Sequence, residues 1–439
     1  SSSVSTFLIV FMAPRASGSG IPDLKAFLNG NGIPGLFSLK TWFARCLGLV
    51  LVTSSGLVVG TEGPCAHIGA ITARGIARSV YSFACLRKHL PGFGHRSDCG
   101  FVAQGCAIGV AAAFGAPVGG ILFSLEEASS YWSKNLTWRS FVGCMIAATL
   151  TKAISVGFRT LPVSGFIAFP DPGAGFEPWE LLPFILIAVC TGIIGAVFCA
   201  LAERLILVRG RFYSCRGPHR QRAYQIMEVL LVTSVTMAVI FWTPLALGCQ
   251  PFSSNAVSGR DLRAASHGWY EGRMTQTICP VGTYSGLGLI FLESKETAIR
   301  ALFTDSFEGG AGFSVVHLLV AAGLIYTLTL VTFNTAIPAG LFVPNILLGA
   351  CIGRAIGQIV YEHVGLETHR GVYALVGAVG MLAGYSRMTV SLAMITLELT
   401  QSTRLLLPVV LCILVSKSVA DALKADSVYE IGVALHPLG

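Results

Sequence analysis

The sequence has little charge. Only 12% of its 439 residues are Asp, Glu, Lys or Arg, and 53% are hydrophobic, whereas a soluble globular domain has about 25% charged residues. This composition excludes a cytosolic enzyme and a disordered chain, and the net charge of +8 is too sparse for binding nucleic acid. Residues 99–125, 181–202, 229–259 and 309–353 contain no charged side chain. Each stretch exceeds the roughly 20 apolar residues that cross a bilayer, so a multi-pass integral membrane protein is predicted.

Metal-site spacing and a signal peptide are also missing. The 13 cysteines lie mostly inside apolar segments, where they are small packing residues. Cys249 and Cys279 differ, because both lie in the long polar stretch 248–313. The sequence leaves open whether they pair; a disulfide would place this stretch on a luminal or extracellular side. The chain opens inside the apolar stretch 6–13, as if cut from something longer.

The charges that are present predict a topology. Residues 74–96 and 204–222 contain basic side chains and no acid, so both stretches are predicted to face the cytoplasm. The stretch 248–313 mixes both signs, and a single crossing over 229–247 places it on the opposite side.

Glycine and proline are abundant, at 50 and 19 residues. Helices must form the membrane spans, because isolated strands leave backbone groups unsatisfied in lipid. Helices broken by glycine and proline are tolerated there where they line a cavity, so the interruptions favour a transporter or channel.

An internal repeat organises the chain. Six positions recur 280 residues later, and a second block recurs at an offset of 272 with Gly105, Ala111, Leu125 and Glu126 over Gly377, Ala383, Leu397 and Glu398. The first block comprises Gly60, Pro64, Gly69, Ala70, Arg74 and Ile76, matched by Gly340, Pro344, Gly349, Ala350, Arg354 and Ile356. We therefore predict two repeat halves, 1–203 and 226–439, joined by a basic cytoplasmic linker, 204–225. The repeat itself leaves open whether the halves are parallel or inverted.

Three glycine-rich breaks each precede a proline that opens an apolar helix. They are GSGIP at 18–22, GTEGP at 60–64 and AGLFVP at 339–344. Helix N-termini present unpaired N–H groups and a partial positive charge, so several at one depth form an anion site without a full cation. The candidate anion-binding residues are Ser19, Gly63, Leu341 and Phe342; the alternative for Ser19 is an ordinary N-cap.

Glu62 places a carboxylate at one of these helix N-termini. It could simply stabilise the helix end, which contributes about 0.3 to 1 kcal/mol. An intramembrane charge costs at least about 2.5 kcal/mol, so a functional role is the default. A carboxylate here can occupy an anion site and leave when protonated, which makes Glu62 a candidate gate.

Two further acids, Glu126 and Glu127, follow a long uncharged stretch. At the offset of 272, Glu126 aligns with Glu398, whereas Glu127 aligns with Leu399 and has no acidic counterpart. We therefore assign Glu126 a structural role and Glu127 a role peculiar to one half, such as proton relay, against the alternative of a solvated acid at a helix end.

Together these motifs resemble the CLC family of chloride channels and chloride/proton antiporters. The three breaks, AAFGAPVGGILFSLEE at 112–127 and SRMTVSLAMITLEL at 386–399 occur in the family's order and cover nearly the whole chain. The resemblance implies an all-α, inverted-repeat fold whose broken, tilted helices meet at a midplane anion site, in a homodimer with one anion pathway per subunit. It also implies that Ser19, the amides of Leu341 and Phe342, and the hydroxyl of Tyr429 hold chloride.

The resemblance further implies an activity. Glu62 matches the family's gating glutamate and Glu127 the internal proton glutamate of its antiporters, so chloride/proton exchange is expected rather than catalysis. Ser19 favours chloride over nitrate. Thr61 stands where many members carry Lys or Arg, which implies a weaker positive potential near the gate.

The resemblance assigns no cofactor and no metal to this chain, with chloride as a bound substrate. Nucleotide would bind only to the cytosolic regulatory domains, which this sequence lacks together with the family's first helices. The pieces GCQP at 248–251 and CPVGTY at 279–284 look most like the lysosomal and late-endosomal branch, and a plasma-membrane location and an accessory subunit stay open.

Two rival functions stay open as well. One is a passive chloride channel of the same fold, in which Glu62 gates without coupled protons. The other is a transporter of organic anions, which predicts a larger polar site.

Overall fold

The computed structural model describes residues 1–82, 95–156, 175–251, 279, 283–304, 313–364 and 369–435. In the N-terminal half, the elements are α1 (Ser2–Met12), η1 (Pro14–Ala16), α2 (Ile21–Leu28), α3 (Leu39–Thr53), α4 (Glu62–Ser82), α6 (His95–Phe114), α7 (Pro117–Phe123), the π-helical turn η2 (Ser124–Ala128), α8 (Lys134–Val156), η3 (Pro178–Glu180) and α9 (Leu181–Ser214). In the C-terminal half, they are α10 (Pro218–Leu247), β1 (Gln250–Pro251), β2 (Thr283–Tyr284), α13 (Gly286–Leu292), α14 (Lys295–Phe303), α15 (Val315–Thr332), α16 (Phe342–Val364), α17 (Arg370–Ser386), α18 (Val390–Thr400), η5 (Thr403–Leu405), α19 (Leu406–Leu423) and α20 (Val428–Leu435).

Six helices in the described residues are long and apolar enough to cross a membrane. They lie in α6, α9, α10, α15, α16 and α19. The uncharged stretch 99–125 contains more than one helix, because α6 ends at Phe114 and α7 begins at Pro117. Gly115 between them has φ +67°, a conformation that favours glycine.

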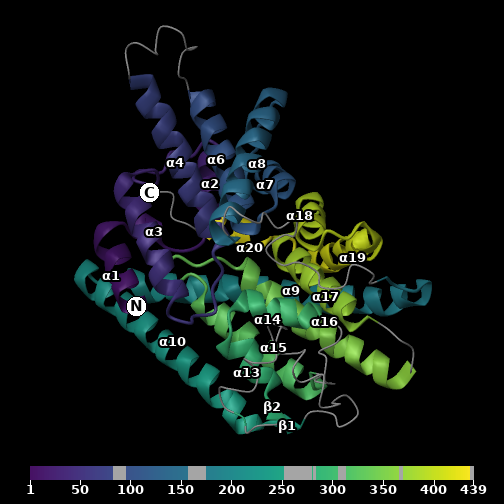
Figure 1. Ribbon diagram of the computed structural model, residues 1–439. Helices are drawn as coiled ribbons and strands as arrows, with labels where there is room; N and C mark the ends of the chain where they lie inside the picture. Colours follow the sequence, from purple (N-terminus) through teal and green to yellow (C-terminus); the bar gives the residue numbers. More distant parts are fainter. Residues whose placement is uncertain are drawn as a thin grey trace.

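The two repeat halves use the same helix pair. In the first, α4 packs against α6, and a side chain at Gly69 would clash with the carbonyl of Gly105. In the second, α16 packs against α17, and a side chain at Gly349 would clash with the carbonyl of Gly377. These glycines are repeat partners at the offsets found in the sequence, and Figure 1 shows the α4–α6 group in the upper part of the molecule and the α16–α17 group at the lower right.

The halves exchange one contact reciprocally. Glu126 of η2 accepts hydrogen bonds from the amides of Thr389 and Ser391 at 2.7 and 2.9 Å, at the start of α18. Its repeat partner Glu398, on α18, accepts from the amides of Val118 and Gly119 in the first turn of α7. Each acid thus caps a helix of the other half, as a two-fold relation between the halves requires. The structural role predicted for Glu126 is confirmed.

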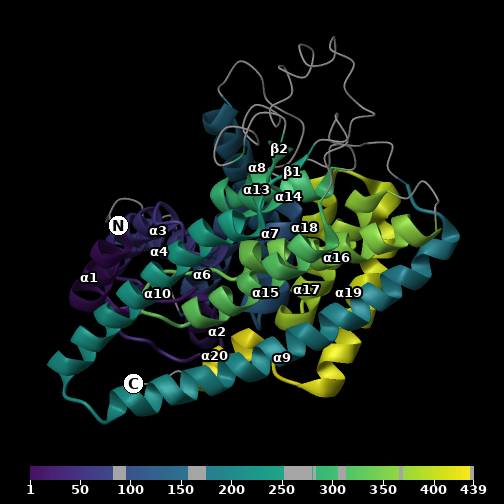
Figure 2. The same ribbon diagram turned by 90° about the horizontal axis from the view of Figure 1, so that it is seen from below.

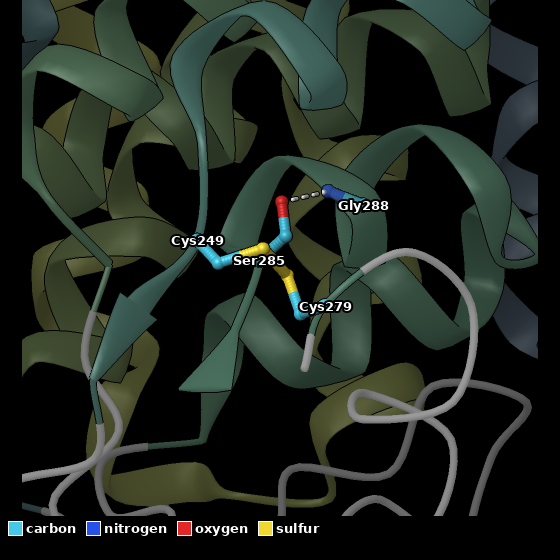
Figure 3. The surroundings of a disulfide bond; sticks show 4 residues. All are labelled: Cys249, Cys279, Ser285 and Gly288. Atoms are coloured by element: carbon cyan, nitrogen blue, oxygen red, sulfur yellow. Dashed lines mark hydrogen bonds between the residues drawn. A yellow bond between two sulfur atoms is a disulfide. The ribbon is translucent and has the colours of Figure 1, made fainter. Parts of the chain in front are cut away.

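Cys249 and Cys279 form a disulfide beside the β1–β2 hairpin (Figure 3). Next to it, the Ser285 hydroxyl caps α13 by accepting from the amide of Gly288 at 3.1 Å. Figure 2 shows the hairpin and the α9–α10 turn at opposite ends of α10, as the predicted crossing requires. Most of the stretch 248–313 lies outside the described residues.

The basic linker 204–225 is mostly helical rather than an extended loop. Helix α9 continues to Ser214, and α10 begins at Pro218. Arginine is a good helix former, so the turn is confined to the short segment where Gly217 and Pro218 interrupt the pattern.

Candidate anion and proton site

The three glycine-rich breaks meet through backbone hydrogen bonds. Gly60 and Gly340, which are repeat partners, exchange N–H···O bonds of 2.8 and 2.9 Å in an antiparallel bridge. The amide of Gly18 donates to the carbonyl of Ile337 at 2.8 Å, and the amide of Ala339 donates to the carbonyl of Gly18 at 3.3 Å. Segments 280 and about 320 residues apart are thereby joined.

Each break leads into a helix N-terminus, as predicted. Helix α2 begins at Ile21, α4 at Glu62 and α16 at Phe342, and a proline follows within the first turn of each. Leu341 and Phe342 are buried, with exposed fractions of 3% and 1%. Leu341 directly precedes α16 and Phe342 opens it, so their backbone N–H groups lie at the helix N-terminus, where amides have no intrahelical acceptor.

Ser19 lies two residues before the start of α2, whose N-cap is Gly20, and is buried. Its hydroxyl accepts from the amide of Ile21 at 3.4 Å. A Cβ at Gly63 would lie 2.8 Å from the Cβ of Ser19, so only glycine lets the start of α4 approach this residue. A cavity of about 430 Å³ reaches Ser19 and is also lined by Arg209 and Arg222 of the basic stretch.

Tyr429 at the start of α20 is buried, and its hydroxyl has no hydrogen-bond partner in the described residues. Its ring centroid lies 6.5 Å from that of Tyr385, which in turn lies 6.3 Å from that of Phe342. The Tyr385 hydroxyl is also buried without a partner among these residues. Two hydroxyl donors are therefore available beside the N-terminus of α16. Sequence analysis missed Tyr385, although it is a polar ring near the end of a small-residue helix.

Glu62 is buried at the N-terminus of α4, with an exposed fraction of 3%. Its Oε2 has no hydrogen-bond partner in the described part of the chain. A Cβ at Gly340 would lie 3.3 Å from this atom, so the carboxyl group rests against the glycine bridge. A carboxyl group in this position fills the space that the converging helix N-termini surround.

Glu127 is also buried, but it has a cation. Lys25 of α2 donates to its Oε1 at 3.0 Å and lies 4.0 Å from Glu430 of α20. The charges of Glu62 and Glu127 both act on the hydroxyls of Tyr385 and Tyr429. The two acids thus lie within electrostatic range of the same pair of hydroxyl groups. Lys25 was not considered in the sequence analysis, although it lies one turn beyond GSGIP.

Arg45 of α3 holds the first break in place and was also missed. Its side chain is fully buried and donates to the carbonyls of Arg15, Ser17, Gly18 and Ser19 at 3.0 to 3.3 Å. The signal was a basic residue in the middle of a largely apolar helix, but its acceptors are backbone atoms about 30 residues away, which a side-chain pattern does not reveal.

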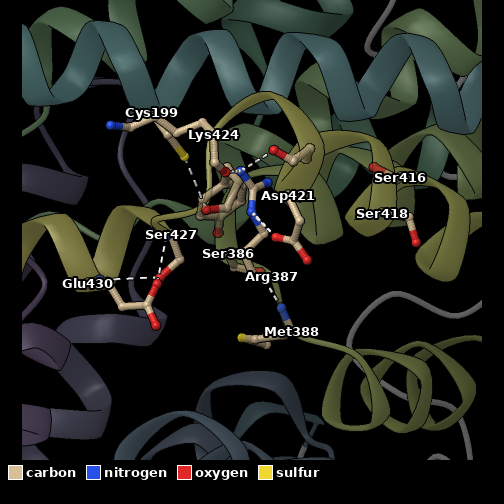
Figure 4. A network of polar contacts seen from close by, with 12 residues as sticks. Cys199, Ser386, Arg387, Met388, Ser416, Ser418, Asp421, Lys424, Ser427 and Glu430 are labelled. Atoms are coloured by element: carbon tan, nitrogen blue, oxygen red, sulfur yellow. Dashed lines mark hydrogen bonds and ion pairs between the residues drawn. The ribbon is translucent and has the colours of Figure 1, made fainter.

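A polar network at the end of α17 and α19 positions the segment that carries Tyr429 (Figure 4). Arg387 pairs with Asp421 at 2.9 Å and donates to the carbonyls of Ala420 and Lys424. Lys424 pairs with Glu203 of α9 at 2.5 Å, and this hydrogen bond raises the pKa of Lys424. The α19–α20 connection is therefore bound to two other helices.

No group of three or more metal-ligating side chains occurs among the described residues. His67, one turn beyond Glu62, is buried with its ring 6.2 Å from that of Phe37.

Comparison with known proteins gives the chain a family. A family model described as voltage gated chloride channel matches residues 2–421. The chain belongs to this family. Among its relatives, chloride channel protein A of Dictyostelium discoideum is 34% identical over 97% of this chain and 52% of its own length. The H(+)/Cl(-) exchange transporter 7 of Homo sapiens is 33% identical over 98% of this chain and 52% of its own length.

Solved CLC structures share the fold. A crystal structure of a eukaryotic CLC transporter superposes with a TM-score of 0.70 at 24% identity, covering 99% of this chain and 64% of that one. A slow cyanobacterial Cl-/H+ antiporter gives a TM-score of 0.70 at 18% identity, over 99% of this chain and 85% of that one. The predicted all-α membrane fold is confirmed. The chain spans about half the length of the relatives named above.

Proposed function

We propose that this chain exchanges chloride for protons across a membrane. The observation that carries the proposal is Glu62, a buried carboxyl group with an unpartnered oxygen at the bridge between the two repeat halves. An acid in lipid-spanning structure is costly and implies function. The name of the human relative, an H(+)/Cl(-) exchange transporter, supports the proposal.

The anion would bind where the helix N-termini meet. The hydroxyls of Ser19 and Tyr429 and the amides of Leu341 and Phe342 at the N-terminus of α16 supply donors, and Gly63 permits the close approach of α4. Partial charges attract an anion yet let it leave, which a permeation site needs. The cavity lined by Arg209 and Arg222 gives chloride a route to Ser19.

Protons would use the two acids. When ionised, Glu62 competes with chloride for the same donors; when protonated, it loses that attraction and leaves the path. Glu127 receives protons from the side of the basic stretch, with Lys25 beside it. Binding of an anion and protonation of Glu62 are then linked, which is the requirement for exchange.

The test is the reversal potential of the purified full-length protein in liposomes, under a chloride gradient with and without a pH gradient. Exchange predicts a reversal potential that moves with pH. Glu62→Ala and Glu127→Ala should each abolish proton movement and retain chloride flow. A wild-type reversal potential fixed at the chloride equilibrium value would instead establish a passive channel, which the name chloride channel protein A of the Dictyostelium relative favours.

We further propose a homodimer in an intracellular, lysosomal or late-endosomal membrane. The motif pieces around Cys249 and Cys279, and a disulfide suited to an oxidising compartment, support this location. The division at 203 and 226 into repeat halves is part of the proposal and is supported by the reciprocal caps of Glu126 and Glu398.

A further inference from the structure

A lysine outside the family motifs contacts the gate segment. Lys295 opens α14, and its ammonium donates to the carbonyls of Leu57 and Val59, the latter at 2.9 Å. These carbonyls belong to the stretch that leads directly to Gly60 and Glu62. Lys295 belongs to the C-terminal repeat half, whereas Glu62 belongs to the N-terminal half. Helices α13 and α14 follow β2 in the chain and lie near the disulfide hairpin (Figure 2).

The charge of Lys295 reaches the Glu62 carboxyl group. Its ammonium contacts the carbonyl of Val59, three residues before Glu62, while its neighbour Glu296 carries the opposite charge at an exposed position. The motif GTEGP has no cation of its own, since Thr61 is neutral. Lys295 therefore supplies positive potential to a segment whose sequence lacks it.

Two features indicate that Lys295 does more than donate hydrogen bonds to backbone carbonyls. An ammonium has three N–H donors and the two carbonyls use two, so within the described part of the chain one donor remains for another acceptor. A neutral amide could satisfy the carbonyls without the desolvation cost of a charge, which is several kcal/mol for a buried ion.

We propose that Lys295 determines anion affinity at the mouth of the pathway that faces the disulfide hairpin. Its charge favours an anion at the place held by Glu62, whether that anion is the carboxylate or the chloride that replaces it. The inference rests on the proposed chloride transport. It adds Lys295, which lies outside the three glycine-rich motifs, to the residues that bind the anion.

The test compares three variants of the full-length protein in liposomes, with chloride flux measured against chloride concentration on the hairpin side. Lys295→Gln keeps a hydrogen-bond donor and removes the charge, so the apparent chloride affinity should fall about tenfold, at the low end of effects from focused charge. Lys295→Arg keeps the charge and should restore most of the affinity. Lys40→Gln, on an exposed position of α3, removes a charge elsewhere and should change nothing.

Glu296→Gln gives an independent measurement if Lys295→Gln fails to fold. Glu296 is exposed and of opposite sign, so its removal should raise the apparent affinity about two- to threefold. The effect of Lys295→Gln should persist in a Glu62→Ala background, because chloride then occupies the same place.

Wild-type affinity in Lys295→Gln, or its loss in Lys295→Arg as well, would overturn the inference and leave only the carbonyl contacts. Disappearance of the effect in Glu62→Ala would overturn it too. Absence of proton coupling in the wild type, with the affinity changes present, would instead refute the proposed exchange and leave the role of Lys295 standing.

Discussion

Because Arg45 contacts the first break, we predict that its replacement lowers both the stability of the protein and its affinity for chloride. The perturbation is Arg45→Met, which keeps most of the side-chain volume and removes the guanidinium. The four carbonyls of the segment from Arg15 to Ser19 then lose their shared donor. Gly18 keeps a second donor, the amide of Ala339, so three carbonyls are at stake.

The magnitude follows from these three groups. Leaving a buried acceptor unpaired costs about 1 to 3 kcal/mol. The cavity that reaches this segment lets water approach, which favours the lower value, and the sum is about 3 kcal/mol. The Ser19 hydroxyl loses its fixed position at the same time, so the apparent chloride affinity should fall at least tenfold.

The assay is thermal unfolding of the detergent-purified protein, together with chloride binding by titration calorimetry. Arg45→Lys should be intermediate, because one ammonium has three donors and lacks the planar fork of a guanidinium. Lys40→Met on the same helix is the matched control. Unfolding and chloride affinity equal to those of Lys40→Met would refute the argument that Arg45 shapes the anion site.

Three further predictions concern the repeat and the proton route. Glu126→Gln should destabilise the protein by about 1.5 to 3 kcal/mol, because the neutral amide loses charge-assisted bonds at the start of α18; thermal unfolding measures this. Gly349→Ala should prevent folding or lower the unfolding temperature sharply, because its methyl group would meet the backbone of Gly377; size-exclusion profiles and melting report it. Lys25→Gln should slow proton movement more than chloride movement, since Glu127 loses its cation; paired pH and chloride electrodes on liposomes separate the two rates.

The first two of these have a control in the chain. Glu362→Gln changes an exposed acid at the end of α16 and should leave unfolding unchanged. Gly323→Ala adds a methyl group on α15 where no atom lies within 4 Å and should be tolerated. For the proton route, equal slowing of both ions in Lys25→Gln would contradict a specific link to Glu127.

Much of the site could be predicted because its elements are local. The prolines and glycines of GSGIP, GTEGP and AGLFVP dictate where helices start, and the structure begins α2, α4 and α16 within these motifs. The repeat identified Glu126 and Glu398 as equivalent, and the structure gives them equivalent capping roles. The sequence could not show that each caps the other half, because a pattern of offsets contains no contacts.

The residues that sequence analysis missed are single polar side chains with distant partners. Arg45, Lys25, Tyr385 and Lys295 each act on groups from another segment. A lone arginine or lysine in an apolar region has no local motif, and its partners here are mostly backbone carbonyls. The pairing of Cys249 with Cys279 was likewise open until the hairpin placed them together.

The sequence by itself determined the class of the protein, its helix starts and its two equivalent halves, because low charge, prolines and repeated glycines act through local chemistry. Only the tertiary structure decided how the halves meet. The Gly60–Gly340 bridge, the carboxyl group of Glu62 against it and the buried cations around it depend on contacts between segments as much as 280 residues apart. Packing, rather than local preference, brings such segments together.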